Sequence, residues 1–412
     1  MNADADRYDV AIAGGSFVGL ALALALAKGR PGLRVAVVDP VPPAGALSRE
    51  RDGRASALTA ASVNLLGALG VWRAIAPHAQ AMRRIEITDS GLANAVRPPL
   101  LRFDTELEPG APAAHVVENI HLRAALADAA AGADGVTRIV GGVEGMETGG
   151  ACALLRLAGG RQLSCALALA ADGRRSRLRD IAGIRCVGWS YPQAGIVATL
   201  AHERPHEGTA VQHFLPAGPF AFLPLPGDRS SLVWSEDRDE ARRVMALDDA
   251  AFLAEVARRF GGRFGALSLA GPRGSWPLDL HMARAFVAER VALAGDAAHG
   301  VHPLAGQGLN IGLRDVAALA QVVVEATRIG LDIGALAVLE RYERWRRFDS
   351  ALSAFAMDGM NRLFSSDAAG LRMVRSFGLG LVDRAPALKR FFVAEAAGAT
   401  GEVPRLLRGE AI

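Results

Sequence analysis

The sequence predicts an α/β fold that joins a dinucleotide-binding unit of parallel strands to a second, antiparallel sheet. A short apolar strand, a glycine-rich turn and an alanine- and leucine-rich helix follow one another between Tyr8 and Ala27. A second apolar strand runs from Arg34 to Val38 and ends in Asp39. Between Val187 and Pro277 the chain carries several strand-like runs separated by turn residues, which is typical of an antiparallel sheet.

The composition is that of a folded protein and excludes several functional classes. The chain has 412 residues, of which 51% are hydrophobic, so it can bury a large core over more than one domain. A net charge of only +3 argues against nucleic acid as a partner. The three cysteines, Cys152, Cys165 and Cys186, form no disulfide framework and suit a reducing cytoplasm.

The segment from Val10 to Ala27 is apolar enough to resemble a membrane span or a signal-peptide core. Acidic residues precede it, where a signal peptide would carry positive charge, and glycines interrupt it. We therefore interpret it as a buried strand, a turn and a helix.

The turn in this segment has the pattern G-x-G-x-x-G, with serine in place of the second glycine. The first glycine permits the tight turn, the last lets the helix pack closely on the strand, and the middle position lets a pyrophosphate approach the helix N-terminus. Serine is small and can donate a hydrogen bond, so phosphate binding is expected to survive. The expected cofactor contacts in the turn are Gly14, Gly15, Ser16, Val18 and Gly19.

Asp39 lies 20 residues beyond Gly19, the spacing at which a carboxylate binds the adenosine ribose hydroxyls. The alternative interpretation is a strand-end residue before the turn at Pro40. No second fingerprint of this kind is present in the sequence. We therefore expect one tightly held dinucleotide, and any second nucleotide must bind without its own Rossmann unit.

Two later segments repeat the pattern of a strand that ends in a glycine and an aspartate. The strand from Leu167 to Ala171 runs into Asp172-Gly173 and a basic helix start. The strand from Arg290 to Ala294 ends in Gly295-Asp296. A loop of glycines and amide side chains follows and opens a helix, so its N–H groups can face an anion.

Together these three segments resemble the three fingerprints of the FAD-dependent aromatic hydroxylases. The run from Gly295 to Asp315 resembles more narrowly the ubiquinone-biosynthesis hydroxylases (the UbiH/UbiF/VisC group). The resemblance covers nearly the whole chain and departs at Ser16 and Asp39, where these enzymes more often have glycine and glutamate. It implies an FAD-binding Rossmann-like domain of the aromatic-hydroxylase type, an antiparallel-sheet substrate domain and a C-terminal helical segment.

The resemblance also implies roles for individual residues. Asp296 would bind the ribityl hydroxyls of FAD, Arg54 and Arg123 would lie along the FAD chain, and Asp172 would serve both FAD and NAD(P)H. The alternative for Asp172 is a turn-forming residue. The loop before the helix would place N–H groups near the flavin pyrimidine edge. The remaining expected cofactor contacts are Gly295, Gly306, Gly308, Leu309 and Asn310, and the expected catalytic environment of the flavin is Pro303, Gly306 and Gln307.

Two histidines, His299 and His302, lie beside the flavin loop at a spacing that could suggest a metal. No third ligand lies nearby in the sequence, so no metal site is expected. A helix-start histidine commonly satisfies a backbone group, and a catalytic proton role is the alternative. No catalytic base is identifiable.

The positions of the motifs predict a discontinuous organisation. The FAD-binding domain is expected at residues 1–75, 100–185 and 285–345, the substrate domain at 76–99 and 186–284, and the helical segment at 346–412. Four apolar residues of the expected substrate sheet could line a pocket or form ordinary core, namely Phe220, Phe222, Leu225 and Trp234.

The activity implied by the resemblance is hydroxylation of the aromatic ring of a polyprenylated phenol in ubiquinone biosynthesis. NAD(P)H would reduce FAD, and O₂ would then give a flavin hydroperoxide that attacks the ring. The alternatives are a flavin monooxygenase of a small soluble phenol and a non-catalytic subunit of a biosynthetic assembly.

The expected location is the cytoplasm, either free or peripheral on the inner membrane face. Basic residues from Glu340 onward suit an anionic membrane surface or a partner in a multi-enzyme complex. A solvated helical face is the alternative for this basic segment.

Overall fold

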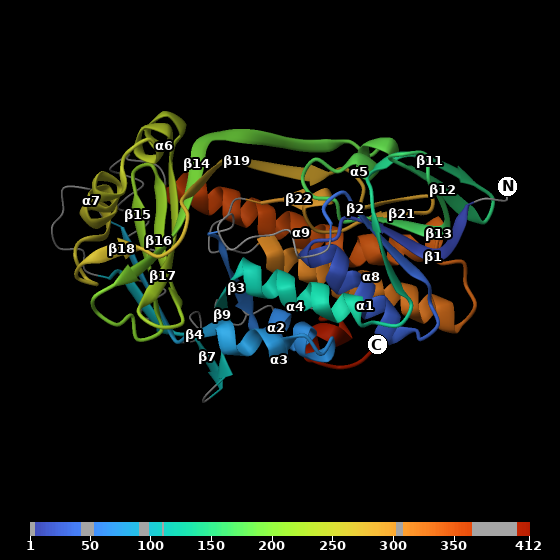
Figure 1. The fold of residues 1–412 in the computed structure, drawn as a ribbon, viewed down its shortest axis with the longest axis horizontal. Coiled ribbons are helices and arrows are strands. Elements are labelled where there is room, and N and C mark those ends of the chain that lie inside the picture. The colour runs from blue at the N-terminus through green and yellow to red at the C-terminus, as the bar shows by residue number, and fades with distance from the viewer. Residues whose placement is uncertain (1–4, 43–52, 90–98, 109–110, 302–307, 365–401) are drawn as a thin grey trace.

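The computed structural model describes residues 5–42, 53–89, 99–108, 111–301, 308–364 and 402–412. The molecule is elongated, with a largely antiparallel sheet and two helices at one end and a helix-covered, mainly parallel sheet at the other (Figure 1). Two long strands run along one side and connect the two ends, namely β14 (Cys186–His202) and β19 (Gly274–Ala283).

The first sheet has eight strands and is parallel at its centre. Strand β13 pairs in parallel with β1 on one side and with β21 on the other, so it joins a strand near the N-terminus to one from the last third of the sequence. Strand β2 pairs with β1, and β10 pairs with β2. The strands are β1 (Asp6–Ala13), β2 (Val35–Asp39), β10 (Val136–Val140), β11 (Val143–Gly149), β12 (Cys152–Leu157), β13 (Gln162–Ala170), β20 (Val287–Ala288) and β21 (Val291–Leu293).

Helix α1 (Phe17–Gly29) is buried on nearly every face, because it packs against β1 and also contacts helices α4 and α8. This burial explains the unbroken apolar run from Val10 to Ala27. Within the described ranges, no helix is both long and apolar enough to cross a membrane. The other helices of this part are α2 (Ala60–Ala68), α3 (Trp72–Ile75), α4 (Asn119–Ala131), α5 (Arg177–Ile181), α8 (Gly308–Arg328) and α9 (Leu336–Phe364).

The second sheet has nine strands, in the order β22-β19-β14-β17-β16-β15-β5-β6, with β18 beside β14. The strand-like runs expected between Val187 and Pro277 form strands β14 to β17 of this sheet. Strand β6 also belongs to it, although the predicted boundary at residue 100 assigned that segment to the nucleotide domain. The strands not yet given are β5 (Arg84–Asp89), β6 (Leu101–Asp104), β15 (Thr209–Leu215), β16 (Gly218–Leu225), β17 (Arg229–Asp237), β18 (Leu267–Leu269) and β22 (His299–Gly300).

Helices α6 (Arg238–Met245) and α7 (Asp249–Phe260) cover one face of this sheet. Phe222 stacks on Phe260 with ring centroids 3.9 Å apart, and Phe220 and Trp234 are buried in the same cluster. Leu225 is fully buried in a separate apolar cluster. The burial of these four residues supports the core interpretation.

Two small sheets complete the described strands. A three-stranded sheet has the order β3-β9-β4 and packs against the nine-stranded sheet through β16. Its strands are β3 (Ala55–Thr59), β4 (Ala79–Met82) and β9 (Ala114–Glu118), and the two-stranded sheet is formed by β7 (Glu106–Glu108) and β8 (Ala111–Pro112).

Helix α9 crosses the predicted boundary between residues 345 and 346 and links the two ends of the molecule. Near its C-terminus, Asp358 accepts a hydrogen bond from the hydroxyl of Tyr191 in β14, at 2.6 Å. The C-terminal tail packs against α2 and α8, where Leu406 and Leu407 are buried in the main core. Much of the basic segment expected to meet a membrane or a partner, residues 365–401, lies outside the described residues.

Candidate cofactor-binding site

The glycine-rich turn between β1 and α1 is too tight for any other residue at two positions. Gly14 has a φ of +104°, and a Cβ there would lie 2.2 Å from the carbonyl oxygen of Ala171. A Cβ on Gly19 would lie 1.8 Å from the carbonyl oxygen of Gly14. Both glycines are therefore required by close backbone contacts, as the fingerprint predicts.

A cavity of about 150 Å³ opens at this turn and the N-terminus of α1. Ser16 is the N-cap residue of α1, and its exposed hydroxyl makes no capping hydrogen bond. Arg123 extends from α4 and lies over the ring of Phe17, 5.3 Å from its centroid. Positive charge and a helix N-terminus together suit a pyrophosphate. Arg138 of β10, which the sequence did not point to, also lines this cavity.

Asp39 lies at the end of β2 on the same cavity. Its carboxylate accepts hydrogen bonds from the backbone N–H of Gly15 at 2.5 Å and of Val41 at 2.7 Å. The side chain therefore fixes the glycine turn and presents its remaining lone pairs to the cavity. Ribose binding by Asp39 stays a prediction.

Asp172 follows β13 and lies beside the glycine turn, because a Cβ on Gly14 would also contact its backbone nitrogen. One carboxylate oxygen accepts hydrogen bonds from the N–H groups of Arg177 at 2.8 Å and Leu178 at 3.2 Å. The other oxygen is buried and has no hydrogen-bond partner among the described residues. A buried carboxylate oxygen without a donor is costly, so this position suits a hydroxyl or N–H group of a ligand.

The turn at Gly295 and Asp296 meets the glycine-rich turn through Val18. Gly295 has a φ of +60°, and a Cβ there would lie 2.9 Å from the Val18 side chain. A Cβ on Gly312 of α8 would lie 2.8 Å from the same side chain. The first and third fingerprints therefore come together in space. Asp296 is exposed, and its backbone carbonyl accepts a hydrogen bond from Nε2 of His281 at 2.9 Å.

A buried ionic cluster lies behind this turn. Asp315 of α8 is fully buried and accepts hydrogen bonds from the N–H of Gly295 at 2.9 Å, from Nε2 of His299 at 2.6 Å and from Nε of Arg346 at 2.8 Å. Burial raises the pKa of Asp315, but the charges of His299 and Arg346 outweigh burial and hold the pKa below its usual value. This cluster was not predicted from the sequence, although an aspartate among the apolar residues of α8 was a usable signal.

The other residues expected to contact the cofactor lie in different surroundings. Gly308 and Leu309 begin α8, the helix that also carries Asp315. The side chain of Asn310 is buried, where it accepts from the N–H of Thr59 at 3.0 Å and donates to the carbonyl of Ala57 at 2.7 Å. Arg54 is exposed and lies over Trp276, 5.4 Å from the ring centroid. Three expected residues lie outside the described residues, namely Pro303, Gly306 and Gln307.

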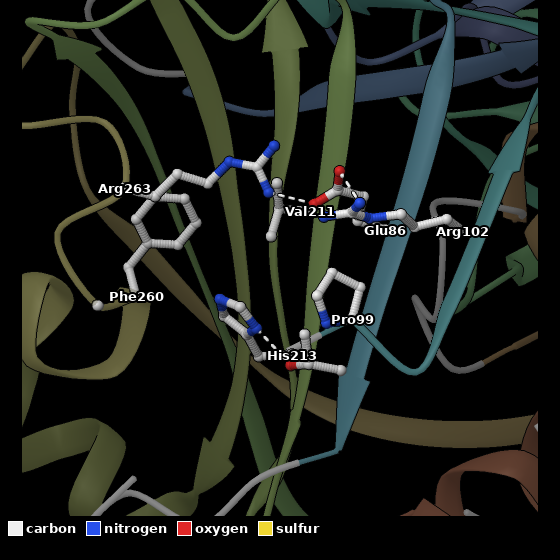
Figure 2. Close-up of a pocket in the computed structure, with 9 residues that line it drawn as sticks. Glu86, Pro99, Arg102, Val211, His213, Phe260 and Arg263 are labelled. Carbon is white, nitrogen blue, oxygen red and sulfur yellow. Dashed lines mark hydrogen bonds and ion pairs between the residues drawn. The ribbon is translucent and has the colours of Figure 1, made fainter. Parts of the chain in front are cut away.

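A second cavity, of about 210 Å³, lies at the far end of the molecule beside α7 (Figure 2). Its wall holds the buried Glu86, which pairs with Arg263 and with Arg102, the latter at 3.3 Å. Burial raises the pKa of Glu86, but the hydrogen bond and charge of Arg263, with the charges of Arg102 and Arg84, hold it below its usual value.

His213, also in the wall of this second cavity, hydrogen-bonds through Nδ1 to the hydroxyl of Thr88 at 2.6 Å. The cavity contains no residue of the three fingerprints, so it is not the cofactor site. In the described part of the chain, no group of three or more His, Cys, Asp or Glu side chains could hold a metal ion.

Comparisons with known proteins identify the family to which the chain is similar. The FAD binding domain family matches residues 7–347. The chain is 42% identical to the ubiquinone hydroxylase UbiL of Rhodospirillum rubrum, over 99% of this chain and 95% of that protein. It is 36% identical to the 3-demethoxyubiquinol 3-hydroxylase of Escherichia coli, over 93% of this chain and 96% of that protein.

The fold is also found among solved structures. The p-nitrophenol 4-monooxygenase PnpA of Pseudomonas putida superposes with a TM-score of 0.81 at 19% identity, over 96% of this chain and 99% of that one. At this level of identity the likeness concerns the fold alone.

Proposed function

Because the chain belongs to the FAD binding domain family and, within it, to the ubiquinone-biosynthesis hydroxylases, we propose that it is an FAD-dependent monooxygenase that hydroxylates the aromatic ring of a polyprenylated phenol. The observation that carries this proposal is the 42% identity to a ubiquinone hydroxylase over 99% of the chain. The contact of the first and third fingerprints at Val18 supports it, because both fingerprints must reach one cofactor.

The residues at the three turns fit FAD. The cavity at the glycine turn joins small residues, a helix N-terminus and Arg123, which suits the pyrophosphate. Asp39 would bind the adenosine ribose, and the exposed Asp296 would bind the ribityl chain. The unsatisfied oxygen of Asp172 would accept a hydrogen bond from a hydroxyl or N–H group of a nucleotide. When bound, FAD supplies the activation of O₂, and the protein orients the ring and excludes water.

We propose NAD(P)H as the reductant and expect it to bind only transiently. The sequence contains a single glycine fingerprint, which lies between β1 and α1, and FAD would occupy it. The nicotinamide nucleotide must therefore bind without a Rossmann unit of its own. Pro303, Gly306 and Gln307 remain our proposed residues around the flavin ring.

A polyprenylated substrate places the enzyme near a membrane. Each buried CH₂ group contributes about 0.8 kcal/mol, so a long isoprenoid tail is effectively absent from water. The described helices include none that could cross a bilayer. We therefore propose that the enzyme takes the ring at the inner membrane face, by peripheral contact or from a protein of the same biosynthetic assembly.

Deletion of the gene and complementation test the function directly. The deletion strain is expected to lose ubiquinone and to accumulate a prenylated phenol that lacks one hydroxyl, as measured by mass spectrometry of lipid extracts. The parent gene and the Asp134→Ala variant, altered in an exposed turn, should restore ubiquinone, whereas Asp296→Ala should not.

Two outcomes would contradict the proposal. Normal ubiquinone in a deletion strain without a redundant hydroxylase, together with turnover of a small soluble phenol, would favour a catabolic hydroxylase. Restoration of ubiquinone by a variant of this protein that is purified without bound FAD would favour a non-catalytic subunit.

A further inference from the structure

We propose that Asp315, with His299 and Arg346 as its partners, is the positioning residue that sets the Gly295–Asp296 turn for FAD. The inference rests on the proposed function, because Asp296 is the expected ribityl ligand. These three residues lie behind the turn that carries Asp296. Neither the fingerprint spacing nor the family resemblance gave them a function in FAD binding.

The carboxylate of Asp315 holds the turn at both ends. One oxygen accepts the N–H of Gly295, where the turn begins, at 2.9 Å. The same oxygen accepts from Nε2 of His299, just beyond the end of the turn, at 2.6 Å. Between these two points lies Asp296, whose side chain is exposed. A shift of the carboxylate would therefore move the backbone that carries Asp296.

The carboxylate is itself oriented from the opposite side by α9. Arg346 donates Nε to the second oxygen of Asp315 at 2.8 Å, and its Nη2 donates to the hydroxyl of Ser350 at 3.2 Å. Arg346 also pairs with Asp349, which binds Arg314 of α8 at 3.1 Å. Asp315, His299 and Arg346 are at most 4% exposed, so their geometry is fixed by packing and by these bonds.

This arrangement also assigns a role to His299. Its side chain is 1% exposed and its Nε2 is occupied by Asp315, so it does not face a substrate. The sequence left two interpretations open, a histidine that satisfies a backbone group and a catalytic proton carrier. The Nε2 contact is instead with the side chain of Asp315, which points to a structural role different from either. The same bond explains why a histidine follows the Gly-Asp motif at this position.

The test measures the dissociation constant of FAD by titration of the apoprotein, alongside the thermal unfolding of that apoprotein. In Asp315→Asn one oxygen becomes an amide donor, which then faces either Arg346 or the Gly295 and His299 donors. We expect the FAD dissociation constant to rise about ten- to a hundredfold. His299→Leu should also raise the FAD dissociation constant. His299→Gln keeps a donor near the Nε2 position and should bind FAD like the parent.

The matched control is Glu236→Gln. Glu236 is 7% exposed and forms a buried ion pair with Arg259 at 3.3 Å, on the face covered by α7 at the other end of the molecule. This variant should lower the unfolding temperature of the apoprotein and leave FAD affinity unchanged.

The results separate the possible explanations. Parent-like FAD affinity in Asp315→Asn would overturn the positioning role, as would an equal loss of affinity in Glu236→Gln. If Asp315→Asn does not fold, the comparison of His299→Leu with His299→Gln decides, and equal affinities would overturn the role. A parent protein that binds no FAD would instead refute the proposed function.

Discussion

At the scale of single residues, the candidate site divides into side chains that expose polar groups at the turns and side chains that hold the turns. Asp296 and Ser16 present exposed polar groups at two different turns. Asp39 and Asp315 use their carboxylates to bind backbone N–H groups of Gly15 and Gly295. A carboxylate that accepts a backbone N–H fixes the position of that backbone more firmly than a neutral acceptor does.

Asp296→Ala is expected to weaken FAD binding about ten- to a hundredfold, because a charge-assisted hydrogen bond contributes about 1.5–3 kcal/mol. Equilibrium titration of the apoprotein measures the change. Asp134→Ala, in an exposed turn, is the control and should bind FAD like the parent. If Asp296→Ala retains parent affinity, Asp296 does not contact the cofactor.

At the scale of secondary-structure elements, the close approach of α1 to β1 depends on one helical glycine. Gly19→Ala would place a Cβ 1.8 Å from the carbonyl oxygen of Gly14, whereas Gly67 of α2 is exposed with nothing within 4 Å of an added Cβ. Gly19→Ala should therefore lower the free energy of unfolding by about 1–3 kcal/mol or more. Gly67→Ala should raise it by about 0.5–1 kcal/mol. Denaturant unfolding measures both, and similar effects would contradict the close contact.

Helices α6 and α7 are joined by a cluster of arginines around Glu255. Burial raises the pKa of Glu255, but hydrogen bonds from Arg258, Arg243 and Arg259 bring the pKa down to about 2. A carboxyl whose pKa is lower in the folded state contributes stability above its unfolded value of 4.5, and loses it as the pH falls towards 2.

The free energy of unfolding of Glu255→Gln should therefore decrease less than that of the parent when the pH is lowered from about 5 to about 2. Urea titrations at several pH values measure the slope. Glu147→Gln, at an exposed position of β11, should leave the slope as in the parent. Equal slopes in parent and Glu255→Gln would show that the cluster contributes little in solution.

The sequence was informative where local geometry determines the element. The glycine turn, the strand ending in Asp39 and the strands β14 to β17 of the second sheet were predicted because their signals are short-range. The position of β6 in that sheet was not predicted, because strand partners depend on long-range contacts. The partnership of Asp315 with Arg346 was also missed, since no local pattern relates positions on two different helices.

At the scale of the whole molecule, the C-terminal tail is part of the core of the nucleotide-binding half. Leu407 is 3% exposed, and its carbonyl accepts a hydrogen bond from Asn64 of α2 at 3.2 Å. Ile412 packs against α1, where a Cβ on Gly29 would lie 2.9 Å from it. Removal of the tail would therefore disturb folding as well as any surface contact.

Leu407→Ala should lower the free energy of unfolding by about 2–5 kcal/mol, because it removes a buried side chain. Leu331→Ala, at a position that is 49% exposed, should change it by no more than about 0.5 kcal/mol. Chemical denaturation of the two variants compares them directly. A small effect at Leu407 would mean that the tail is not part of the cooperative core.

The central position of β13, between β1 and β21, has a consequence for synthesis of the protein on the ribosome. The glycine turn emerges early, but β21, the Asp296 turn and α8 emerge only after about two-thirds of the chain has been made. Pairings of such high sequence separation form slowly. A nascent chain therefore has no complete cofactor site, and chaperones would meet an exposed, strongly apolar α1 for most of translation.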